Sequence, residues 1–511
     1  MPLVQESNPQ EFLVDLQDRF RIEELPSDDN NDDYEDIDSE TDDIGMNGAV
    51  STGRTLRSSK HRPPWLQQAT LGLFHEDLKT TTSEAQAKVT RECLPHLLGQ
   101  DNQGLALNSH GLPHLRRSQH ISYLHAQFEK LPAPYVVMDA SRPWLFYWML
   151  CGLSTLGEDI SHYRERLIET ARPLQNATGG FGGGHGQLSH LAGTYATVLA
   201  LAMVKALEVI DRKAMWHWLG TVKQADGGFC MALEAEEDIR GAYCAMTIIT
   251  ILSLPLEIPP GAPAREAGLT SFTDGLGEWV GRCQTYEGGI GGAPSNEAHG
   301  AYAFCALACL SIIDAPQISI PKYLDVKSLT AWLAARQTQP EGGFQGRQEK
   351  LVDACYSHWV GGCFALLEAA LHGAAAAPSK DIADVWNREA LVRYLLTCAQ
   401  QPTKKGGMRD KPSTRPDAYH TCYSLAGLSH AQNRYIYKAK ATAPEESSAR
   451  SIAAFRWSAR SPDRKEMSDL RIEDADVVDF VHPVFVIPMQ AVEAARKQFA
   501  HATLDIDSFT R

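Results

Sequence analysis

The feature that most constrains the fold of this chain is an internal repeat. A Gly-Gly pair followed by Phe, Ile or Met occurs five times, and a tyrosine within an apolar, small-residue segment follows 14 to 17 residues after the first glycine. A sixth such tyrosine, in SRPWLFYWMLCGL, lacks only the glycines. The pairs begin at Gly179, Gly227, Gly288, Gly342 and Gly406, and the tyrosines are Tyr147, Tyr195, Tyr243, Tyr302, Tyr356 and Tyr423. This periodicity is typical of an array built from one supersecondary unit.

Each repeat is predicted to be a helical hairpin. Successive tyrosines lie 48 to 67 residues apart, which is enough for two helices of about 15 to 20 residues and two connections. Segments such as TYATVLALAMVKAL are apolar almost all round, whereas ALVRYLLTCAQ and LTAWLAARQT have a polar and an apolar face. Buried inner and amphipathic outer helices predict an all-α fold, an (α/α)6 barrel of helical hairpins over residues 66–433. An open solenoid remains the alternative, because ring closure is not written in the sequence.

Composition changes at both ends of the array. The chain of 511 residues has a net charge of −15, and residues 22–53 hold twelve acidic residues without a Lys or Arg. Residues 1–65 are therefore predicted to be an acidic, largely disordered leader, and the near-neutral remainder argues against a nucleic-acid partner. Residues 434–475 are predicted to be a loop insertion, and residues 476–511 a C-terminal segment that packs on the barrel.

The cysteines bear on the compartment. None of the eleven forms a C-x-x-C pair, and six lie in apolar runs. This usage indicates reduced thiols and predicts a cytoplasmic protein. We expect neither a signal peptide nor a membrane span, because no stretch is both long and apolar enough.

Residues at one offset from the aligned tyrosines are expected to form a ring near one mouth of the barrel. Two neighbouring repeats contribute Asp353 and His420, three residues before the tyrosine, and Cys355, one residue before it; together they supply O, N and S donors. Three such ligands suit a catalytic zinc with one open position. The alternative interpretation is structural: Asp353 caps a helix, Cys355 is a small buried residue and His420 satisfies another helix start.

The same ring is rich in basic residues. Arg240, His299, Arg347 and Lys350 would place four cations around one rim, which indicates a phosphate or diphosphate ligand. Pairing with Glu349 and other surface acids is the alternative. Beneath the rim, aromatic residues could line an apolar cavity for a chain that carries the diphosphate, or could simply belong to the core. They are Trp144, Trp148, Tyr195, Tyr243, Tyr302 and Trp359.

These motifs resemble a known family. SRPWLFYW, EEDIRGAYCA, EAHGAYAFCAL, GGFQGRQEKLVD, LVDACYSHW and PDAYHTCYSLAGLS resemble the β subunits of protein farnesyltransferases, in that family's order. The resemblance runs from about His120 to Leu428, with VHPVFVIP at residues 481–488 resembling the family's end. It implies a prenyltransferase and terpenoid-cyclase-like toroid.

The resemblance also implies a role for each site residue. Asp353, Cys355 and His420 would be the zinc ligands, and these three, with Tyr356 and Lys350, would be the catalytic residues. The diphosphate would be bound by Arg240, His299, Arg347, Lys350 and Tyr356. The farnesyl pocket would be lined by Trp144, Tyr195, Tyr243, Tyr302, Cys305 and Trp359, and the peptide site by Trp144, Trp148 and Tyr419. Asp410 would bind magnesium, although Thr414 and Pro416 replace basic residues of the family in the loop that follows it.

The implied activity is farnesyl transfer from farnesyl diphosphate to the cysteine of a C-terminal C-a-a-X sequence, through a zinc-bound thiolate. The implied partners are an α subunit, in an obligate heterodimer, and C-a-a-X proteins such as small GTPases. A geranylgeranyltransferase β subunit is the nearest alternative, and the bulk of Trp144 and the presence of Asp410 favour farnesyl. A glycoside hydrolase would need paired carboxylates where this ring has only Asp353, and a non-catalytic scaffold would have no use for a metal.

Overall fold

The computed structural model describes residues 78–101, 104–373, 385–438 and 453–499. The chain divides into two units, Met1–Leu73 and Phe74–Arg511, and every described residue belongs to the second. The predicted acidic leader at 1–65 lies outside the described residues. Within the part of the chain that the structure describes, no helix has the length and apolar character needed to cross a membrane.

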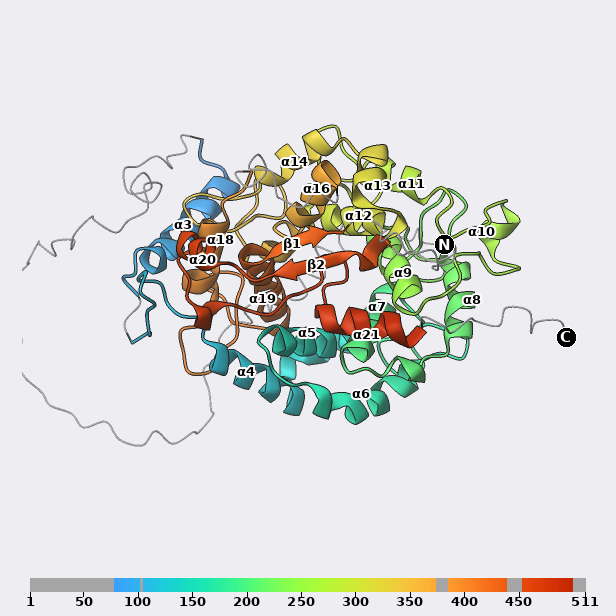
Figure 1. Cartoon of the computed structure of the whole chain (residues 1–511), viewed down its shortest axis with the longest axis horizontal. Helices are drawn as coiled ribbons and strands as arrows, with labels where there is room; N and C mark the ends of the chain where they lie inside the picture. Colours follow the sequence, from blue (N-terminus) through green and yellow to red (C-terminus); the bar gives the residue numbers. More distant parts are fainter. Residues whose placement is uncertain (1–77, 102–103, 374–384, 439–452, 500–511) are drawn as a thin grey trace, which may run out of the picture. The chain divides into compact units, whose positions relative to one another are not determined.

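Six inner positions form a closed ring at the centre of the second unit (Figure 1). Each inner helix contacts the next, from α5 through α7, α9, α12 and α15 to α19, and α19 contacts α5. The predicted closed barrel is therefore confirmed, and the open solenoid is wrong. The inner helices are α5 (Arg142–Thr155), α7 (Leu191–Met203), α9 (Ile239–Ile251), α12 (Gly300–Ile313), the pair α15 (Tyr356–Trp359) and α16 (Cys363–His372), and α19 (Ala418–Gln432).

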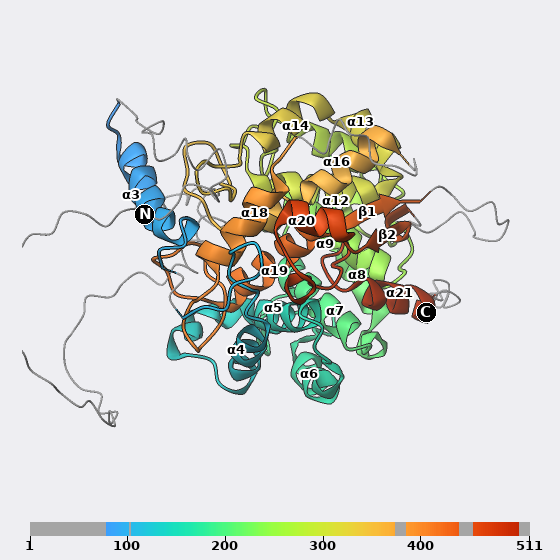
Figure 2. The same ribbon diagram turned by 60° about the vertical axis from the view of Figure 1, so that its left-hand side comes forward.

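The second helix of each hairpin lies outside this ring, as α4 and α6 do beside α5 and α7 (Figure 2). The outer helices are α4 (Arg117–Glu129), α6 (Arg164–Ala171), α8 (Arg212–Val222), α11 (Leu276–Arg282), α14 (Val326–Ala334) and α18 (Arg388–Tyr394), which continues as the π-helix η6 (Leu395–Ala399). Three further helices are α3 (Thr81–Leu97), α10 (Pro263–Glu266) and α13 (Pro316–Tyr323). Short 3-10 turns are η2 (Ala133–Ser141), η3 (Ser161–Tyr163), η4 (Arg172–Leu174), η5 (Leu207–Val209), η7 (Ala453–Phe455) and η8 (Asp474–Asp476).

One outer helix differs from its sequence pattern. ALVRYLLTCAQ was expected to have an exposed polar face, but every residue from Ala390 to Ala399 is buried in α18 and η6. The reason is a further layer, because α3 packs on η6 and α20 (Arg464–Leu470) packs on α18. The amphipathic pattern of α14 is kept, since its buried residues fall on one face.

The Gly-Gly pairs join each repeat to the next outer helix. Gly227 has φ +106°, and a Cβ there would lie 2.2 Å from the carbonyl oxygen of Gly275, the N-cap of α11. Only glycine allows both this backbone conformation and this approach. The first glycine of each of the other four pairs also has a positive φ and approaches the backbone of the next outer helix; the last, Gly406, approaches Gln119 of α4.

A glutamine side chain strengthens several of these joints. Gln284 Nε2 donates to the carbonyl oxygens of Gly288 (3.0 Å) and Asp325 (3.1 Å), and its Oε1 accepts the N–H of Asp325 (2.8 Å), the N-cap of α14. Gln400 has the same role at ring closure, where its Oε1 accepts the N–H of Arg116 (2.8 Å), the N-cap of α4. The last repeat is thus bonded to the first.

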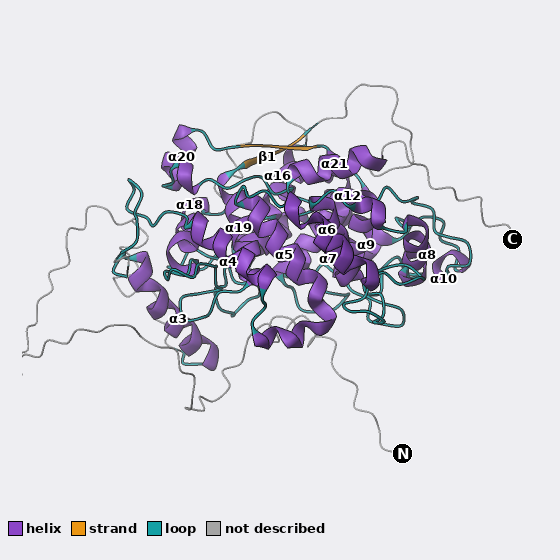
Figure 3. Cartoon of the chain, turned by 90° about the horizontal axis from the view of Figure 1, so that it is seen from below, coloured by secondary structure: helices purple, strands orange, loops and turns teal. Residues whose placement is uncertain are grey.

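C-terminal elements lie along one side of the helical body, and α3 projects toward the opposite side (Figure 3). They are strand β1 (Arg434–Tyr437), paired antiparallel with β2 (Trp457–Arg460), then α20 and α21 (Met489–Phe499), which packs on α7 and α9. The segment predicted as a loop insertion at 434–475 therefore contains regular structure. Residues 481–488 bind the barrel directly, since the hydroxyl groups of Tyr243 and Tyr147 donate to the carbonyl oxygens of Val484 (2.7 Å) and Val486 (2.8 Å).

Candidate metal centre and anion rim

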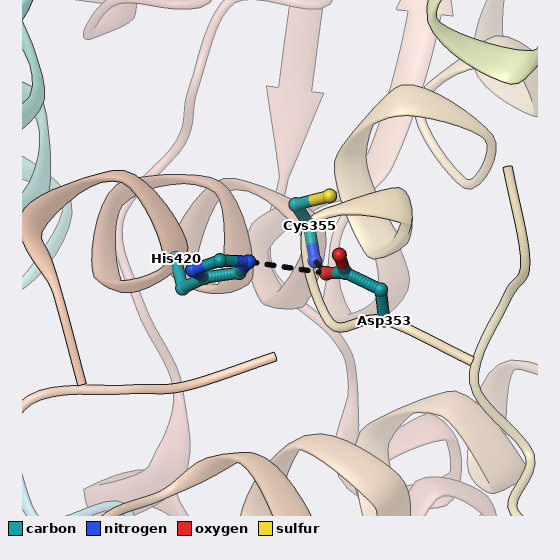
Figure 4. Close-up of side chains that lie close together, drawn as sticks. All are labelled: Asp353, Cys355 and His420. Carbon is teal, nitrogen blue, oxygen red and sulfur yellow. Dashed lines mark hydrogen bonds and ion pairs between the residues drawn. The ribbon is translucent and has the colours of Figure 1, made fainter. Parts of the chain in front are cut away.

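The three residues predicted to bind zinc lie together where α15 and α19 begin (Figure 4). Asp353, Cys355 and His420 each offer one ligand atom, and these atoms all lie within 4.8 Å of one another. His420 Nε2 is 3.3 Å from Asp353 Oδ1, and the N–H of Cys355 donates to the same oxygen (2.8 Å). Asp353 therefore also accepts a backbone N–H at a helix start, as the structural interpretation expects.

Asp417 orients His420, a role that was not predicted from the sequence. It is the N-cap of α19: its Oδ1 accepts the N–H of His420 (2.7 Å), and its Oδ2 lies 2.6 Å from His420 Nδ1. Because Nδ1 faces a carboxylate it carries the proton, which leaves Nε2 as the nitrogen facing Asp353 and Cys355. The available signal was the D-x-x-H spacing at a predicted helix start, where aspartate is a favoured cap.

The charged groups of this cluster shift one another's pKa values. Burial alone would raise the pKa of Asp353, but His420 and Lys411 outweigh it and hold that pKa well below its usual range. Burial opposes the charged form of His420, yet the carboxylates of Asp417 and Asp353 raise its pKa well above its usual value. Burial and then the Asp353 charge raise the pKa of the Cys355 thiol. The donor set fits zinc, which is bound by oxygen, sulfur and nitrogen ligands and whose own charge deprotonates a bound thiol.

Asp410, the predicted magnesium ligand, is already engaged. The Lys411 ammonium contacts one of its carboxylate oxygens, and the Thr414 hydroxyl contacts the other. A carboxylate held in this way fits magnesium poorly, because Mg²⁺ is bound through free carboxylate and phosphate oxygens. The backbone of Asp410 has a different use, since its carbonyl oxygen accepts the N–H of Ala354 (3.0 Å), between the two candidate ligands Asp353 and Cys355.

Two of the four predicted rim cations lie in ion pairs. Arg240 Nε and Nη2 bind the two carboxylate oxygens of Asp238 (2.8 and 2.9 Å), and Arg347 Nη1 lies 2.7 Å from Glu297 Oε2. The Lys350 side chain is exposed. The rim therefore carries less uncompensated positive charge than the sequence alone indicates, because Asp238 and Glu297 lie within its own loops.

His299 contributes a hydrogen-bond donor to the rim. It caps α12, where its Nδ1 accepts the N–H of Ala301 (3.0 Å), and its Nε2 lies 3.2 Å from the hydroxyl oxygen of Tyr356. Burial, followed by the charges of Arg347 and Arg240, lowers the pKa of His299 to about 3. It is therefore neutral near pH 7, with its proton on Nε2, rather than the cation predicted from the sequence.

An unbroken circuit of aromatic contacts links all six inner positions. Ring centroids of successive members lie 4.6 to 5.9 Å apart, and the last member contacts the first. In order, the members are Trp144, Trp148, Tyr419, Tyr423, Trp359, Phe304, Tyr243 and Tyr195. The structure thus brings together predicted lipid residues on four helices with the predicted peptide residues Trp148 and Tyr419.

The predicted lipid residues of α12 lie differently. The Tyr302 ring is 5.2 Å from that of His299 and 5.9 Å from the Arg240 guanidinium, so it belongs to the rim. Phe304, which the sequence analysis did not single out, takes its place in the circuit. Cys305 is buried, and burial raises the pKa of its thiol well above the usual range, so it remains an uncharged, apolar neighbour.

Comparisons with known proteins agree with this architecture. Residues 115–487 match the family described as Prenyltransferase alpha-alpha toroid domain. The protein geranylgeranyltransferase-I of Candida albicans, solved in complex with GGPP, superposes with a TM-score of 0.56 at 19% identity, covering 75% of this chain and 99% of that chain. Fold and site together define a prenyltransferase of the alpha-alpha toroid class.

Two curated relatives narrow the class. The protein farnesyltransferase subunit beta of Pyricularia oryzae is 47% identical over 464 residues, covering 89% of this chain and 87% of the relative. The subunit of the same name from Schizosaccharomyces pombe is 38% identical over 323 residues, covering 62% of this chain and 79% of the relative. The chain belongs to the family of protein farnesyltransferase β subunits, which confirms the resemblance drawn from its motifs.

Proposed function

We propose that this chain transfers a farnesyl group from farnesyl diphosphate to the cysteine thiol of a C-terminal C-a-a-X sequence, with one Zn²⁺ held by Asp353, Cys355 and His420. The observation that carries the proposal is the convergence of one oxygen, one sulfur and one nitrogen donor within 4.8 Å. When bound, zinc would lower the pKa of an incoming thiol and keep it nucleophilic at neutral pH.

The protein's own groups prepare this site before any ligand arrives. Asp417 binds the backbone N–H and the ring Nδ1 of His420, and the backbone carbonyl of Asp410 holds the N–H of Ala354 between the other two ligands. Such supporting bonds reduce the reorganisation that ligand binding requires. The acceptor cysteine would approach at the mouth, where the Trp148 and Tyr419 rings pack edge to face.

The diphosphate head would lie at the rim beside the metal ligands. His299 and Tyr356 offer polar hydrogens, and Lys350 and Arg347 offer positive charge as the bond between the farnesyl C1 and its oxygen breaks. Arg240 would stay in its ion pair with Asp238, so it would help to orient the diphosphate more than add net positive charge. The aromatic circuit would receive the farnesyl chain, because apolar surface buried against these rings leaves water.

Partners and compartment follow from the same proposal. We infer an α subunit as the obligate partner, C-a-a-X proteins such as small GTPases as acceptors, and a cytoplasmic location. Mg²⁺ binding beside the diphosphate stays a prediction, and no step is assigned to it because Lys411 and Thr414 engage Asp410.

The test is Cys355→Ala in the full chain co-expressed with the α subunit. We expect stoichiometric zinc and farnesyl transfer to be lost together while the complex still assembles. Cys363→Ala is the matched control, because Cys363 is also a fully buried thiol but donates to the Trp359 carbonyl oxygen (3.2 Å) and does not belong to the metal-ligand cluster of the described residues. Full zinc content and full activity in Cys355→Ala would show that the metal site has been misassigned.

A further inference from the structure

Helix α3 contacts both ends of one loop of the rim. Gln86 and Thr90 lie four residues apart, and therefore on one face of the helix. Gln86 Nε2 donates to the carbonyl oxygen of Lys350 (3.3 Å), and Thr90 Oγ1 donates to Glu341 Oε1 (2.6 Å). One helix face thus binds the first and last residues of the segment 341–350.

The contact at Glu341 is partly buried and charge-assisted. Glu341 is 4% exposed, and the Thr90 hydroxyl supplies a hydrogen bond to its carboxylate. Hydrogen bonds to an ionised group are shorter and stronger than those between neutral groups, and leaving such a group unpaired is costly. Thr90 therefore fixes the start of the loop.

The second contact involves the backbone of Lys350, a residue whose side chain is exposed. The Lys350 N–H donates to Gln345 Oε1 (3.2 Å), and its carbonyl oxygen accepts from Gln86. Both backbone polar groups of Lys350 are therefore bonded, which fixes the direction in which its side chain leaves the backbone. Neighbouring Glu349 has φ +57°, a conformation that favours glycine, so this turn needs support from its surroundings.

The same helix also packs on the outer element η6. Its buried stripe of Val89, Cys93 and Leu97 lies against η6, where Cys398 Sγ contacts the Cys93 carbonyl oxygen (3.9 Å). The chain then leads from Cys398 to Asp410, whose carbonyl oxygen supports the loop of the metal ligands. Helix α3 is thus bonded to the 341–350 loop and packed on η6, from which the chain continues to Asp410.

We propose that Gln86 and Thr90 are positioning residues that hold Lys350 in place for the diphosphate, an inference that rests on the proposed role of Lys350. They touch no reacting atom and act through the backbone of the 341–350 loop. Disconnecting them should weaken binding of the diphosphate substrate and leave binding of the acceptor peptide unchanged.

The test uses Gln86→Ala/Thr90→Val in the full heterodimer, with farnesyl diphosphate and one C-a-a-X peptide. Neither substitution disfavours a helix strongly, so α3 itself should persist. We expect the KM for farnesyl diphosphate to rise roughly 3- to 10-fold with the peptide KM unchanged. Thr90→Ser keeps the hydroxyl group that donates to Glu341, so it should retain the wild-type KM for farnesyl diphosphate. Arg91→Ala, at an exposed position of α3, is the control.

Coupling to Lys350 separates positioning from a general loss of structure. If α3 acts through Lys350, the double substitution should have little further effect in a Lys350→Ala background. An equal effect in both backgrounds, or an equal rise in the peptide KM, would overturn the proposal. Should the double variant fail to assemble, Gln86→Ala alone, which removes only the contact at Lys350, is judged by the same criteria.

Amide hydrogen exchange distinguishes failure of this inference from failure of the proposed function. We expect the amides of residues 345–350 to exchange faster in the double variant than in Arg91→Ala. Unchanged exchange there would refute the positioning role whatever the kinetics show. Faster exchange combined with a Lys350→Ala variant of normal diphosphate KM would instead refute the role of Lys350, and the inference would fall with it.

Discussion

Replacing Asp417 tests how far the metal centre depends on a residue that is not itself a ligand. Asp417 makes two contacts with His420, one to the backbone N–H at 2.7 Å and one to Nδ1 at 2.6 Å. Asp417→Ala removes both, whereas Asp417→Asn keeps an oxygen for the cap and loses the charge that faces the ring. The two variants therefore separate capping of α19 from orientation of His420.

The magnitudes expected from these contacts differ. Loss of an N-cap costs about 1 kcal/mol of stability. Loss of a group that orients a metal-binding histidine lowers metal affinity roughly 10- to 100-fold, or about 1.4 to 2.8 kcal/mol. Asp417→Ala should show both effects, and Asp417→Asn should show reduced zinc affinity with nearly normal stability.

The assay is zinc retention against a competing chelator, with thermal denaturation of the same samples. Asp325→Ala is the matched control, because Asp325 caps the outer helix α14 through the Ser328 N–H (3.1 Å) and faces no metal ligand. It should lose stability as Asp417→Ala does and retain zinc as the wild type does. If Asp417→Ala kept wild-type zinc affinity while losing stability like the control, Asp417 would be a helix cap and nothing more.

Three further predictions concern the barrel and its surface. Tyr243→Phe should lower the free energy of unfolding by about 1 to 2 kcal/mol, because it leaves the buried Val484 carbonyl oxygen without the tyrosine hydroxyl. Thermal denaturation measures this loss, and Tyr286→Phe at a fully exposed site is the control. Burial would raise the pKa of Glu466, but Arg460, the Asp463 N–H and Arg434 lower it from 4.5 to about 2. Its stabilising contribution is therefore present above pH 4.5 and lost as the pH falls toward 2, and Glu466→Gln should flatten the acid limb of the stability profile. Trp144→Thr should shift kcat/KM from farnesyl toward geranylgeranyl diphosphate, since each buried CH₂ contributes roughly 0.8 kcal/mol; an unchanged ratio would make Trp144 a core residue.

The barrel could be predicted because its main determinants are local and repeated. Each Gly-Gly pair marks a turn that only glycine permits, and each apolar segment after it forms an inner helix. Ring closure depends instead on long-range contacts, such as the bond from Gln400 to Arg116, 284 residues apart. A local sequence pattern does not reveal such a pair, so closure of the ring could be seen only in the three-dimensional structure.

The site was predicted by residue type, and its electrostatic partners were not. Asp353, Cys355 and His420 are unusual at the starts of buried helices, and that made them visible. Asp238 and Glu297 are ordinary acidic residues in loops, yet they form ion pairs with Arg240 and Arg347 and partly offset their charge. The basic rim was therefore overestimated, because a sequence shows which charges exist but not which of them face one another.

Residues three positions before the aligned tyrosines differ in role, because the inner helices begin at different distances from those tyrosines. Counted back from its tyrosine, the cap lies five residues earlier in α9, at Asp238, but three residues earlier in α12, at His299. In α19 it lies six residues earlier, at Asp417. The position three before the tyrosine is thus the second residue after the cap in α9, the cap itself in α12, and the third residue after it in α19. Because each inner helix begins at a slightly different place, equivalent positions hold an arginine bound by its cap, a capping histidine and a histidine oriented by its cap. A repeated fold thereby presents an unsymmetrical candidate site.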